Sequence, residues 1–221
     1  MNARDDVREA YASWAATYDT DRNLTRDLDG TVTRQVLSQL RPATILETGC
    51  GTGKNTPFLA EIGAQVVALD FSPEMLARAR SKVQADNVFF AQADLTRPWP
   101  CANACMELVV CNLVLEHIED LGLVFSEAAR VLVDGGRFFV CELHAFWQYE
   151  GKQAVFQRDG EQVAVPAFVH HISSFLAAAE AAGLALVTLG EWWHAEDEGR
   201  PPRLVSFLFE EQLFRNKQVN R

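Results

Sequence analysis

Hydrophobic and polar positions follow two alternating patterns from residue 43 onward. Short runs rich in β-branched residues predict five strands, at 43–47, 65–70, 87–92, 108–112 and 136–142. Amphipathic stretches between them predict three helices, at 56–62, 73–83 and 121–133. This alternation is typical of a parallel sheet covered by helices.

The predicted strands carry apolar residues on both faces. Residues 66–69 read VVAL, so every position in that run offers a hydrophobic side chain. A strand with one face in water would alternate apolar and polar residues instead. We therefore expect helices on both sides of the sheet.

Two of the predicted helices begin with a recognisable signal. Thr56-Pro57 and Ser72-Pro73 each place a hydroxyl residue directly before a proline. Proline fits the first helical position, and a serine or threonine before it can accept a hydrogen bond from a free backbone N–H group. We therefore expect Thr56 and Ser72 to be the N-caps of these helices.

The segments on either side of this region have patterns of their own. Residues 1–40 predict two helices joined by a polar connection at 17–29. The segment 144–169 contains AVFQRDGEQVAV, two alternating runs around Asp159-Gly160. Such a pattern predicts a β-hairpin.

The end of the chain returns to regular elements. A helix is predicted at 173–182, where Gly183 would end it. Two strands follow, at 184–191 and 204–210. These elements can extend the predicted sheet beyond its five central strands.

Composition narrows the class of protein. The 221 residues include 20 Lys+Arg and 30 Asp+Glu, a net charge of −10, with 48% hydrophobic residues. Binding to a phosphate backbone usually depends on Lys and Arg, so this balance argues against a nucleic-acid partner. No run approaches the roughly 18 to 20 apolar residues of a membrane span, and MNARDDVREA is too charged for a secretory signal. We expect a soluble, cytoplasmic, globular protein.

A glycine-rich loop follows the first predicted strand. Residues 45–54 read ILETGCGTGK, with glycines at 49, 51 and 53. A dinucleotide-binding loop, G-x-G-x-x-G, would place a glycine or alanine where Lys54 stands. A Walker-type loop needs four residues between its first glycine and Gly-Lys, and this spacing is absent. Both phosphate-binding interpretations are therefore disfavoured.

Acidic residues stand where three successive strands end. Glu47 ends the first strand, Asp70 the second, and Asp94 follows the third. The carboxyl ends of parallel strands form the edge at which open α/β sheets bind ligands. A carboxylate at the end of the second strand can accept hydrogen bonds from both hydroxyls of a ribose. The loop and the acids together predict a ligand site at this edge.

These features occur within a series of recognisable motifs. The runs ILETGCGTGKNT, ALDFSPEML, AQADL, ELVVCNLVLEHIED and ARVLVDGGRFFVCE occur in this order. They resemble the motifs of class I S-adenosylmethionine-dependent methyltransferases, and most of all the small-molecule enzymes of ubiquinone and menaquinone biosynthesis. The resemblance covers residues 10–143.

The resemblance implies a single α/β domain over residues 1–221. Its sheet would be Rossmann-like and doubly wound, with seven strands, mostly parallel, and the last strand antiparallel. The implied parts are an N-terminal helical cap, a cofactor-binding half, a substrate-side hairpin insertion after the fifth strand, and a C-terminal helix with strands. Their ranges are 1–40, 41–143, 144–169 and 170–221.

The same resemblance assigns residues to S-adenosylmethionine as cofactor. Glu47 and the backbone around Gly49 and Gly51 would serve its methionine part, and Asp70 its ribose hydroxyls. This cofactor carries a positive charge at sulfur and no phosphate, so carboxylates suit it better than an anion-binding loop. Glu47 as a solvated residue at the end of a strand is the alternative.

The adenine would lie between side chains from two further loops. Phe71 and Met75 would flank the ring, while Asp94 and the backbone of Leu95 would bind its edge. Asp94 can alternatively be a simple turn residue.

The sulfonium would lie near the end of the fourth strand. Asn112 and Leu113 are implied beside it, and Tyr18 would cover the cofactor from the N-terminal segment. His117 belongs to a dipeptide, Glu116-His117, that is typical of the family. The alternative for His117 is to brace its loop, and Leu113 can be a core residue.

Two histidines are candidate catalytic residues. His144 follows the fifth strand and His171 opens the helix after the insertion, both on the expected substrate side. A histidine with a pKa near neutral can deprotonate an acceptor. The alternative is that each caps a helix or hydrogen-bonds to a loop.

A metal site is not expected. Cys101 and Cys105 form a pair, but a structural zinc site needs four ligands, usually in C-x-x-C pairs, and no second pair has a matching spacing.

The expected activity is methyl transfer from S-adenosylmethionine to a small molecule through an O-, N- or C-nucleophile. Aromatic residues in the flanking segments favour an apolar or aromatic acceptor, namely Tyr11, Trp14, Phe146, Trp147, Tyr149, Phe156 and Phe168. The alternatives are an enzyme acting on a protein, tRNA or carrier-bound acyl group, and a non-catalytic cofactor-binding partner subunit. Either a monomer or a homodimer would be compatible with these features.

Overall fold

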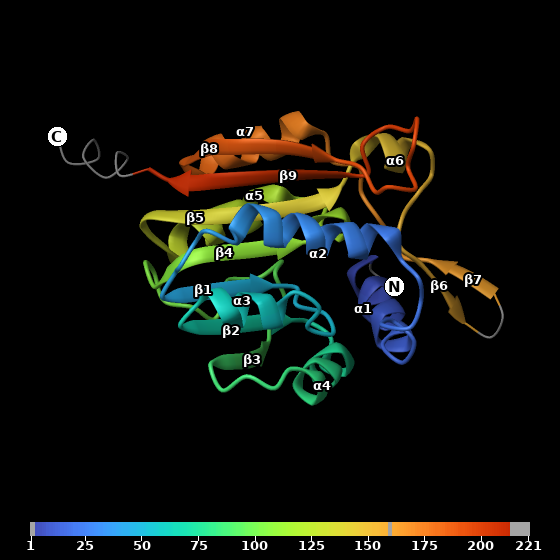
Figure 1. The fold of residues 1–221 in the computed structure, drawn as a ribbon, viewed down its shortest axis with the longest axis horizontal. Coiled ribbons are helices and arrows are strands. Elements are labelled where there is room, and N and C mark those ends of the chain that lie inside the picture. The colour runs from blue at the N-terminus through green and yellow to red at the C-terminus, as the bar shows by residue number, and fades with distance from the viewer. Residues whose placement is uncertain (1–2, 159–160, 213–221) are drawn as a thin grey trace.

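The computed structural model describes residues 3–158 and 161–212. In this part of the chain, seven strands form one sheet in the order β3-β2-β1-β4-β5-β9-β8 (Figure 1). The strands are β1 (Thr44–Thr48), β2 (Gln65–Asp70), β3 (Val88–Gln92), β4 (Met106–Asn112), β5 (Leu132–Leu143), β8 (Leu184–Trp192) and β9 (Leu204–Glu211). The helices are α1 (Ala3–Trp14), α2 (Leu24–Leu37), α3 (Thr56–Ile62), α4 (Pro73–Lys82), α5 (Leu121–Val131), α6 (Ala145–Tyr149) and α7 (Ile172–Ala182), with a 3₁₀ turn η1 (Leu115–His117).

The direction of the strands matches the expected topology. β1 to β5 pair in parallel wherever they are neighbours, and β9 runs antiparallel to both β5 and β8. The prediction of a seven-stranded, mostly parallel sheet with an antiparallel last strand is therefore confirmed. Helical connections of this kind are what allow neighbouring strands to run parallel.

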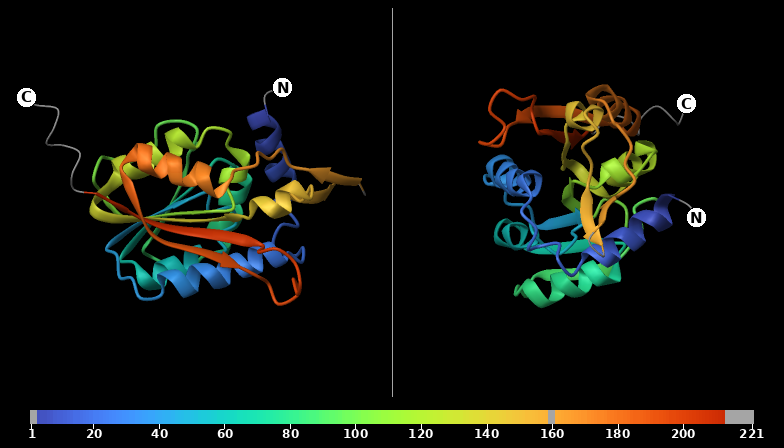
Figure 2. Two further views of the ribbon diagram at one scale, coloured as in Figure 1. Left: turned by 90° about the horizontal axis from the view of Figure 1, so that it is seen from above. Right: turned by 90° about the vertical axis from the view of Figure 1, so that its right-hand side faces the viewer.

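Both faces of the sheet are covered, as the apolar strands predict. In β5, Phe138 and Val140 pack in a core cluster with residues of α5 and α7. Their neighbours Phe139 and Cys141 pack in a second cluster, on the other face, with residues of α2 and α3. Figure 2 shows these two layers of helices on opposite sides of the strands. Successive side chains of a strand point to opposite faces, which explains the alternation.

The predicted N-cap is confirmed for α4 and is wrong for α3. Ser72 caps α4, because its hydroxyl accepts a hydrogen bond from the Met75 backbone N–H at 3.2 Å. Thr56 does not cap α3: Asn55 is the N-cap, and Thr56 is the first helical residue. The Thr56 hydroxyl instead donates to Glu47 at 2.6 Å. A buried carboxylate nearby therefore takes the hydroxyl that would otherwise cap the helix.

The first connection is shorter than predicted. α2 begins at Leu24 with Asn23 as its N-cap, so the second half of the predicted connection 17–29 is helical. Two of its charged residues, Arg26 and Asp29, are buried within α2, although Asp27 is exposed. The prediction of a polar connection is therefore wrong from residue 24 onward, where the chain is helical.

The expected hairpin lies outside the main sheet. β6 (Val155–Arg158) and β7 (Glu161–Ala164) pair antiparallel, while the predicted turn Asp159-Gly160 falls outside the described residues. The hairpin lies beside α1 in Figure 1. The rings of Phe156 and Trp14 stack with their centroids 5.6 Å apart. Trp14 and Phe156, 142 residues apart in the sequence, thus belong to one small core beside the carboxyl ends of the strands.

The helices are short. The longest in the described part of the chain, α2, has 14 residues. None of the described helices combines the length and the apolar character that crossing a membrane requires.

We expect Phe156→Ala to loosen this small core without unfolding the sheet. The ring is buried, and removing a buried phenylalanine side chain costs about 3 to 5 kcal/mol. Hydrogen exchange should therefore become faster in α1 and the hairpin and stay unchanged in β1 and β4.

Val155→Ala is the matched control, because Val155 is the neighbouring strand residue and is 38% exposed. Equal loss of protection in the two variants would contradict the packing of the hairpin on α1.

Candidate functional site

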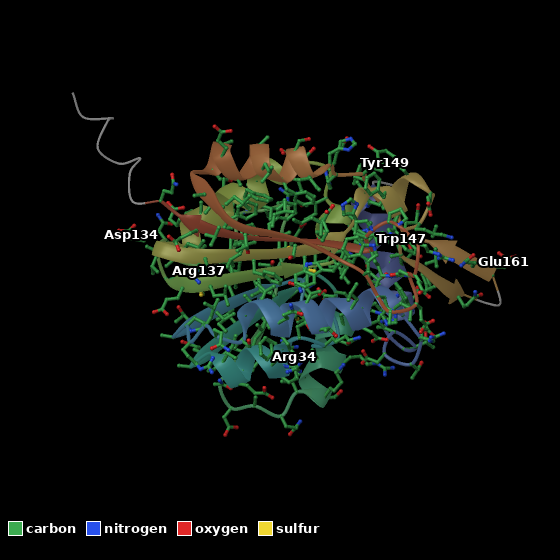
Figure 3. The ribbon with its side chains drawn as sticks, turned by 45° about the horizontal axis from the view of Figure 1, so that its top comes forward. Arg34, Asp134, Arg137, Trp147, Tyr149 and Glu161 are labelled. Carbon is green, nitrogen blue, oxygen red and sulfur yellow. The ribbon has the colours of Figure 1, made fainter. Side chains whose placement is uncertain are left out.

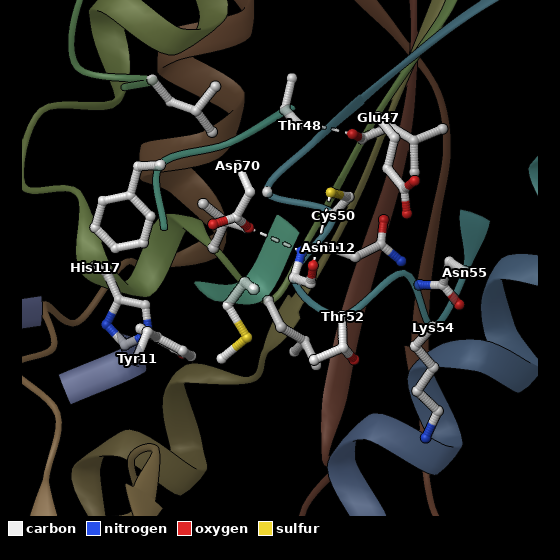
Figure 4. A pocket seen from close by; sticks show the side chains of 18 of the residues that line it. Tyr11, Glu47, Thr48, Cys50, Thr52, Lys54, Asn55, Asp70, Asn112 and His117 are labelled. Carbon is white, nitrogen blue, oxygen red and sulfur yellow. Dashed lines mark hydrogen bonds between the residues drawn. The ribbon is translucent and has the colours of Figure 1, made fainter. Parts of the chain in front are cut away.

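A cavity lies at the carboxyl ends of β1, β2 and β4. We call it the first cavity; its volume is about 130 Å³. Side chains from α1, α2 and the loops after these strands surround it (Figure 4). The lining includes every residue that the resemblance assigns to the cofactor, namely Tyr18, Glu47, Gly49, Gly51, Asp70, Phe71, Met75, Asp94, Leu95, Asn112, Leu113 and His117.

Glycines are required at two positions of the loop after β1. Gly49 has a φ of 71°, and a Cβ atom there would lie 2.2 Å from a methyl group of Val114. Gly51 also has a positive φ, 55°, but open space lies where its Cβ would be. The left-handed backbone favours glycine at both positions. The absence of a side chain at Gly51 leaves the backbone open to the cavity.

Asp70 holds the glycine loop in place. Its carboxylate accepts hydrogen bonds from the backbone N–H of Gly51 at 2.8 Å and of Ser72 at 2.9 Å. The residue is only 5% exposed. Burial raises the pKa of Asp70 to about 6, although these backbone N–H groups act in the opposite direction. Asp70 therefore changes its charge near neutral pH in the ligand-free protein.

Glu47 lies on the other side of the loop. The carboxyl group is buried and accepts the hydrogen bond from the Thr56 hydroxyl. Burial raises its pKa to about 8, and the charges of Asp29 and Asp70 act in the same direction. A positively charged ligand in the first cavity would reverse this effect, because a nearby cation favours the carboxylate.

A hydrogen-bonded group that sequence reasoning missed also faces the first cavity. Asp29 accepts hydrogen bonds from the side-chain amides of Asn112 at 2.6 Å and Asn55 at 2.8 Å. This ties α2 to the end of β4 and to the glycine loop. The buried Oδ1 atom of Asn112 has no partner among the described residues. The missed signal was that α2 continues through Asp29, which turns this side chain inward.

The adenine-side residues lie on the loop after β2, the first turn of α4 and the loop after β3. Met75 and Leu95 are buried, and Phe71 is half-buried. Asp94 accepts hydrogen bonds from the backbone N–H and the hydroxyl of Thr96, at 2.9 and 2.6 Å. Asp94 thus makes the turn that the alternative interpretation expects and lines the first cavity as well.

His117 connects the N-terminal cap to the site. Its Nε2 is 2.8 Å from the hydroxyl of Tyr11, and its Nδ1 is 2.7 Å from the backbone carbonyl oxygen of Pro166. Figure 4 shows Tyr11 and His117 together on one side of the cavity, away from Glu47 and Asn55. His117 therefore braces its loop and lines the first cavity at the same time.

A second cavity, of about 260 Å³, adjoins the first. Four residues line both cavities and form the wall between them, namely Tyr11, Tyr18, Arg26 and Leu113. Leu113 has a φ of 55°, which is rare for a residue other than glycine. Such strained backbone is often found at functional sites. The second cavity also extends to Trp147 and Arg203, on the side of α6 and β9.

The structure brings neither candidate catalytic histidine into the lining of these two cavities. His144 is buried and caps α6, since its Nδ1 accepts a hydrogen bond from the Phe146 backbone N–H at 3.3 Å. Its Nε2 lies 3.0 Å from Glu191. His171 is N-cap of α7, and its ring lies 2.8 Å from the exposed hydroxyl of Tyr149. A role as general base stays a prediction to which these positions lend no support.

Cys101 and Cys105 both have free thiols, and the thiol of Cys105 lies 3.0 Å from the backbone carbonyl oxygen of Ala102. Among the described residues, no group of three or more histidine, cysteine, aspartate or glutamate side chains is placed to hold a metal ion.

Comparison with known proteins identifies the family. A family model described as "Methyltransferase domain" matches residues 46–140. An uncharacterized methyltransferase of Emericella nidulans is 31% identical and covers 82% of this chain and 76% of its own length. A malonyl-[acyl-carrier protein] O-methyltransferase of Hahella chejuensis is 33% identical, and a ubiquinone biosynthesis O-methyltransferase of Xanthomonas oryzae pv. oryzae is 31% identical. They cover 81% and 65% of this chain, which spans 62% and 60% of their lengths.

Solved structures agree on the fold. An S-adenosylmethionine-dependent methyltransferase from Mesorhizobium loti has a TM-score of 0.69 at 21% identity, over 83% of this chain and 100% of its own. The N-methyltransferase NodS from Bradyrhizobium japonicum, in complex with S-adenosyl-L-homocysteine, has a TM-score of 0.68 at 19% identity, over 96% and 99%. With its fold, its ordered motifs and these relatives, the chain belongs to the class I S-adenosylmethionine-dependent methyltransferases.

Proposed function

We propose that this chain transfers a methyl group from S-adenosylmethionine in the first cavity to a small-molecule acceptor in the second. The observation that carries this proposal is the shared wall. Leu113, at the end of β4, lines both cavities, and Tyr18 and Arg26 lie beside it in the same wall. A donor and an acceptor on its two sides would meet there.

The residues around the first cavity fit this cofactor. S-adenosylmethionine offers a sulfonium cation, an ammonium group and two ribose hydroxyls, all of which match acidic or carbonyl partners. The unpartnered Oδ1 of Asn112 is an acceptor for which a ligand would supply the donor. An unsatisfied buried acceptor is costly, so a donor at this point stabilises the bound state. The open backbone at Gly51 leaves room for close approach.

We assign the residues of the first cavity to the parts of the cofactor as the family motifs imply. Asp70 accepts hydrogen bonds from the ribose hydroxyls, and Glu47 with the glycine loop holds the methionine part. Arg26, which the sequence motifs did not single out, lines the same cavity and offers its guanidinium to the methionine carboxylate. Phe71 and Met75 flank the adenine.

Catalysis in this arrangement depends on positioning. Bound S-adenosylmethionine supplies an electrophilic methyl group on a good leaving group. The wall residues hold the acceptor atom in line with that group, and alignment of two reactants is worth up to about 7 to 11 kcal/mol. α1 and the hairpin exclude water, because Trp14, Phe156 and Val165 are buried together. Burial raises the pKa of Tyr18 to about 12, so its hydroxyl stays neutral in the wall.

A carrier-bound acyl group is the second candidate acceptor. The relative from Hahella chejuensis is named for an acyl-carrier-protein substrate, and it covers 81% of this chain. The second cavity, with Lys152 exposed at its lining, could admit the end of such an acyl chain.

Turnover with methyl-labelled S-adenosylmethionine tests the proposed function. We expect label to be transferred to a member of a panel of phenols, aryl amines and aryl carboxylates. Transfer only to malonyl-[acyl-carrier protein] would favour the second candidate. Binding of the cofactor without transfer to either group of acceptors would argue for a non-catalytic binding subunit.

We expect Asp70→Asn to weaken cofactor binding. The variant replaces a carboxylate that accepts ribose hydrogen bonds, and hydrogen bonds to a charged group contribute about 1.5 to 3 kcal/mol each. Calorimetry with S-adenosylmethionine should show a Kd increase of roughly 10- to 100-fold. The control is Asp86→Asn, which removes the same charge from an exposed residue outside both cavities. Wild-type affinity in a folded Asp70→Asn protein would refute the assignment.

We also expect cofactor affinity to rise between pH 5 and pH 7. The pKa of Asp70 in the free protein is raised to about 6, and the ligand binds the carboxylate form. Since only the deprotonated fraction is competent, Asp70 alone should increase affinity about five- to tenfold over this range, and deprotonation of Glu47 adds to the rise. Calorimetry should detect proton release on binding. In Asp70→Asn the increase should become smaller, and an unchanged pH profile in that variant would show that another group is responsible.

A further inference from the structure

The lining of the second cavity holds more cationic than acidic side chains, whereas the chain as a whole is acidic. Its lining includes four cationic side chains, from the residues just before α2, α2 itself, the loop after α6 and the loop before β9, namely Arg22, Arg26, Lys152 and Arg203. Two of them are paired with carboxylates, Arg22 with Glu196 and Arg203 with Asp197. The one acid in this lining is Glu116, a buried residue whose pKa is raised by burial. The chain as a whole has a net charge of −10. Cations gathered in one cavity of an acidic protein point to an anionic ligand.

Two of these cations are buried guanidinium groups with donors to spare. Arg26 is 7% exposed and Arg203 is 8% exposed. Arg203 donates to Asp197 through Nε and Nη2 and to the Thr25 hydroxyl through Nη1. A guanidinium has five N–H donors, so these three contacts leave two for a ligand. The pairing with Asp197 fixes the orientation of the group.

Arg26 has no carboxylate partner among the described residues. Its contacts are the backbone carbonyl oxygens of Tyr18 and Asp21, the second at 2.9 Å. Asp19 and Asp27 interact with Arg26 only through their charge, without a hydrogen bond or ion pair. An anionic ligand group in direct contact with this buried guanidinium, such as the carboxylate of the cofactor, would therefore stabilise the complex. Lys152 is exposed, and no hydrogen bond or ion pair of its ammonium is found in the described part of the chain.

Aromatic rings stand beside these cations. Four rings line the second cavity, from Tyr11, Trp14, Tyr18 and Trp147. The guanidinium of Arg203 lies 4.1 Å from the centre of the Trp147 ring, and that of Arg26 lies 4.0 Å from the centre of the Tyr18 ring. In Figure 3, Trp147 lies at the end of the sheet opposite Asp134 and Arg137. Rings and cations together favour a flat apolar ligand that carries an anionic group.

We propose that the methyl acceptor is an aromatic molecule with a carboxylate or phosphate group, bound in the second cavity. The free N–H donors of Arg203 and the ammonium of Lys152 hold the anionic group, whereas Arg26, in the shared wall, is taken by the carboxylate of the cofactor. The rings of Trp147 and Trp14 hold the aromatic body. This inference rests on the proposed function, because the acceptor must lie against the wall of the first cavity.

Calorimetry on protein saturated with S-adenosyl-L-homocysteine tests this proposal. The probes are benzoate, phenyl phosphate and the neutral analogue benzamide. We expect at least one anionic probe to bind about tenfold or more tightly than benzamide, because charged hydrogen bonds are the stronger ones. The anionic probe that binds more tightly shows whether the second cavity prefers a carboxylate or a phosphate. Equal binding of all three probes would overturn the proposal.

Substitutions of the cationic residues show which side chains cause the preference for anionic probes. Lys152→Gln should reduce the preference for the anionic probe about two- to fivefold, as loss of an exposed ion pair does. Arg203→Gln should reduce it about tenfold or more, and Arg203→Lys tests the forked geometry while keeping the charge. Arg78→Gln is the control, since Arg78 is exposed on α4 and lines neither cavity.

The first titration separates this inference from the proposed function. If S-adenosyl-L-homocysteine does not bind, the proposed function fails. If it binds with wild-type affinity in all variants, and the full preference for anionic probes survives in both Lys152→Gln and Arg203→Gln, the second cavity is not the anion site. Loss of the preference with unchanged affinity for S-adenosyl-L-homocysteine supports the proposal.

Discussion

The hydrogen bond between the Asp70 carboxylate and the Gly51 backbone N–H is the contact on which the site depends. It joins the end of β2 to the loop after β1 at 2.8 Å. The backbone carbonyl of Asp70 also accepts a hydrogen bond from Ala93 at 2.9 Å, which brings the loop after β3 to the same point. One residue therefore sets the relative position of three loops. Since the loops line the first cavity, its shape follows from this contact.

Burial of acidic groups is the cost of this arrangement. Asp70 and Glu47 lie in a region of low polarity, and burial raises the pKa of both. Buried carboxyl groups without a positive partner destabilise the free protein when they ionise. A cationic ligand removes that penalty. The ionised acids therefore destabilise the ligand-free protein but stabilise the complex with the ligand. The site is thus built for a ligand with positive charge and hydrogen-bond donors.

The two cavities differ in charge although they share a wall. Acidic side chains such as Glu47 and Asp70 line the first, and arginine and lysine side chains dominate the second. Arg26 lies at the boundary and lines both. Opposite charges in adjoining cavities favour two different ligands, because the acidic cavity disfavours an anion and the cationic cavity disfavours a cation. The cap of α1 and the hairpin closes the same region with apolar contacts.

Local pattern determined much of what the sequence revealed. Apolar runs, glycine spacing and the acids after strands are short-range signals, and they predicted the strands, the helices and a ligand site at the edge of the sheet. The number of strands, the antiparallel last strand and the cofactor residues followed from the resemblance of the ordered motifs. Predictions that depend on long-range contacts were less reliable. Thr56 donates to Glu47 instead of capping α3, and Asp29 turns inward from a helix to meet Asn112. Neither partner is near in sequence, so no local pattern contains the contact.

The second cavity was decided by tertiary structure alone. Arg26, Lys152 and Arg203 belong to three segments that are far apart along the chain, and no motif joins them. His144 and His171 show the opposite case, since position in the sequence suggested a catalytic role but their side chains pack into a helix cap and against Tyr149. The sequence by itself determined the α/β class and the ligand-binding edge, because hydrogen bonding and burial along strands and helices repeat with short periods, and its ordered motifs indicated the family. Only packing between distant segments decided which charges face the acceptor, because that depends on which side chains meet in space.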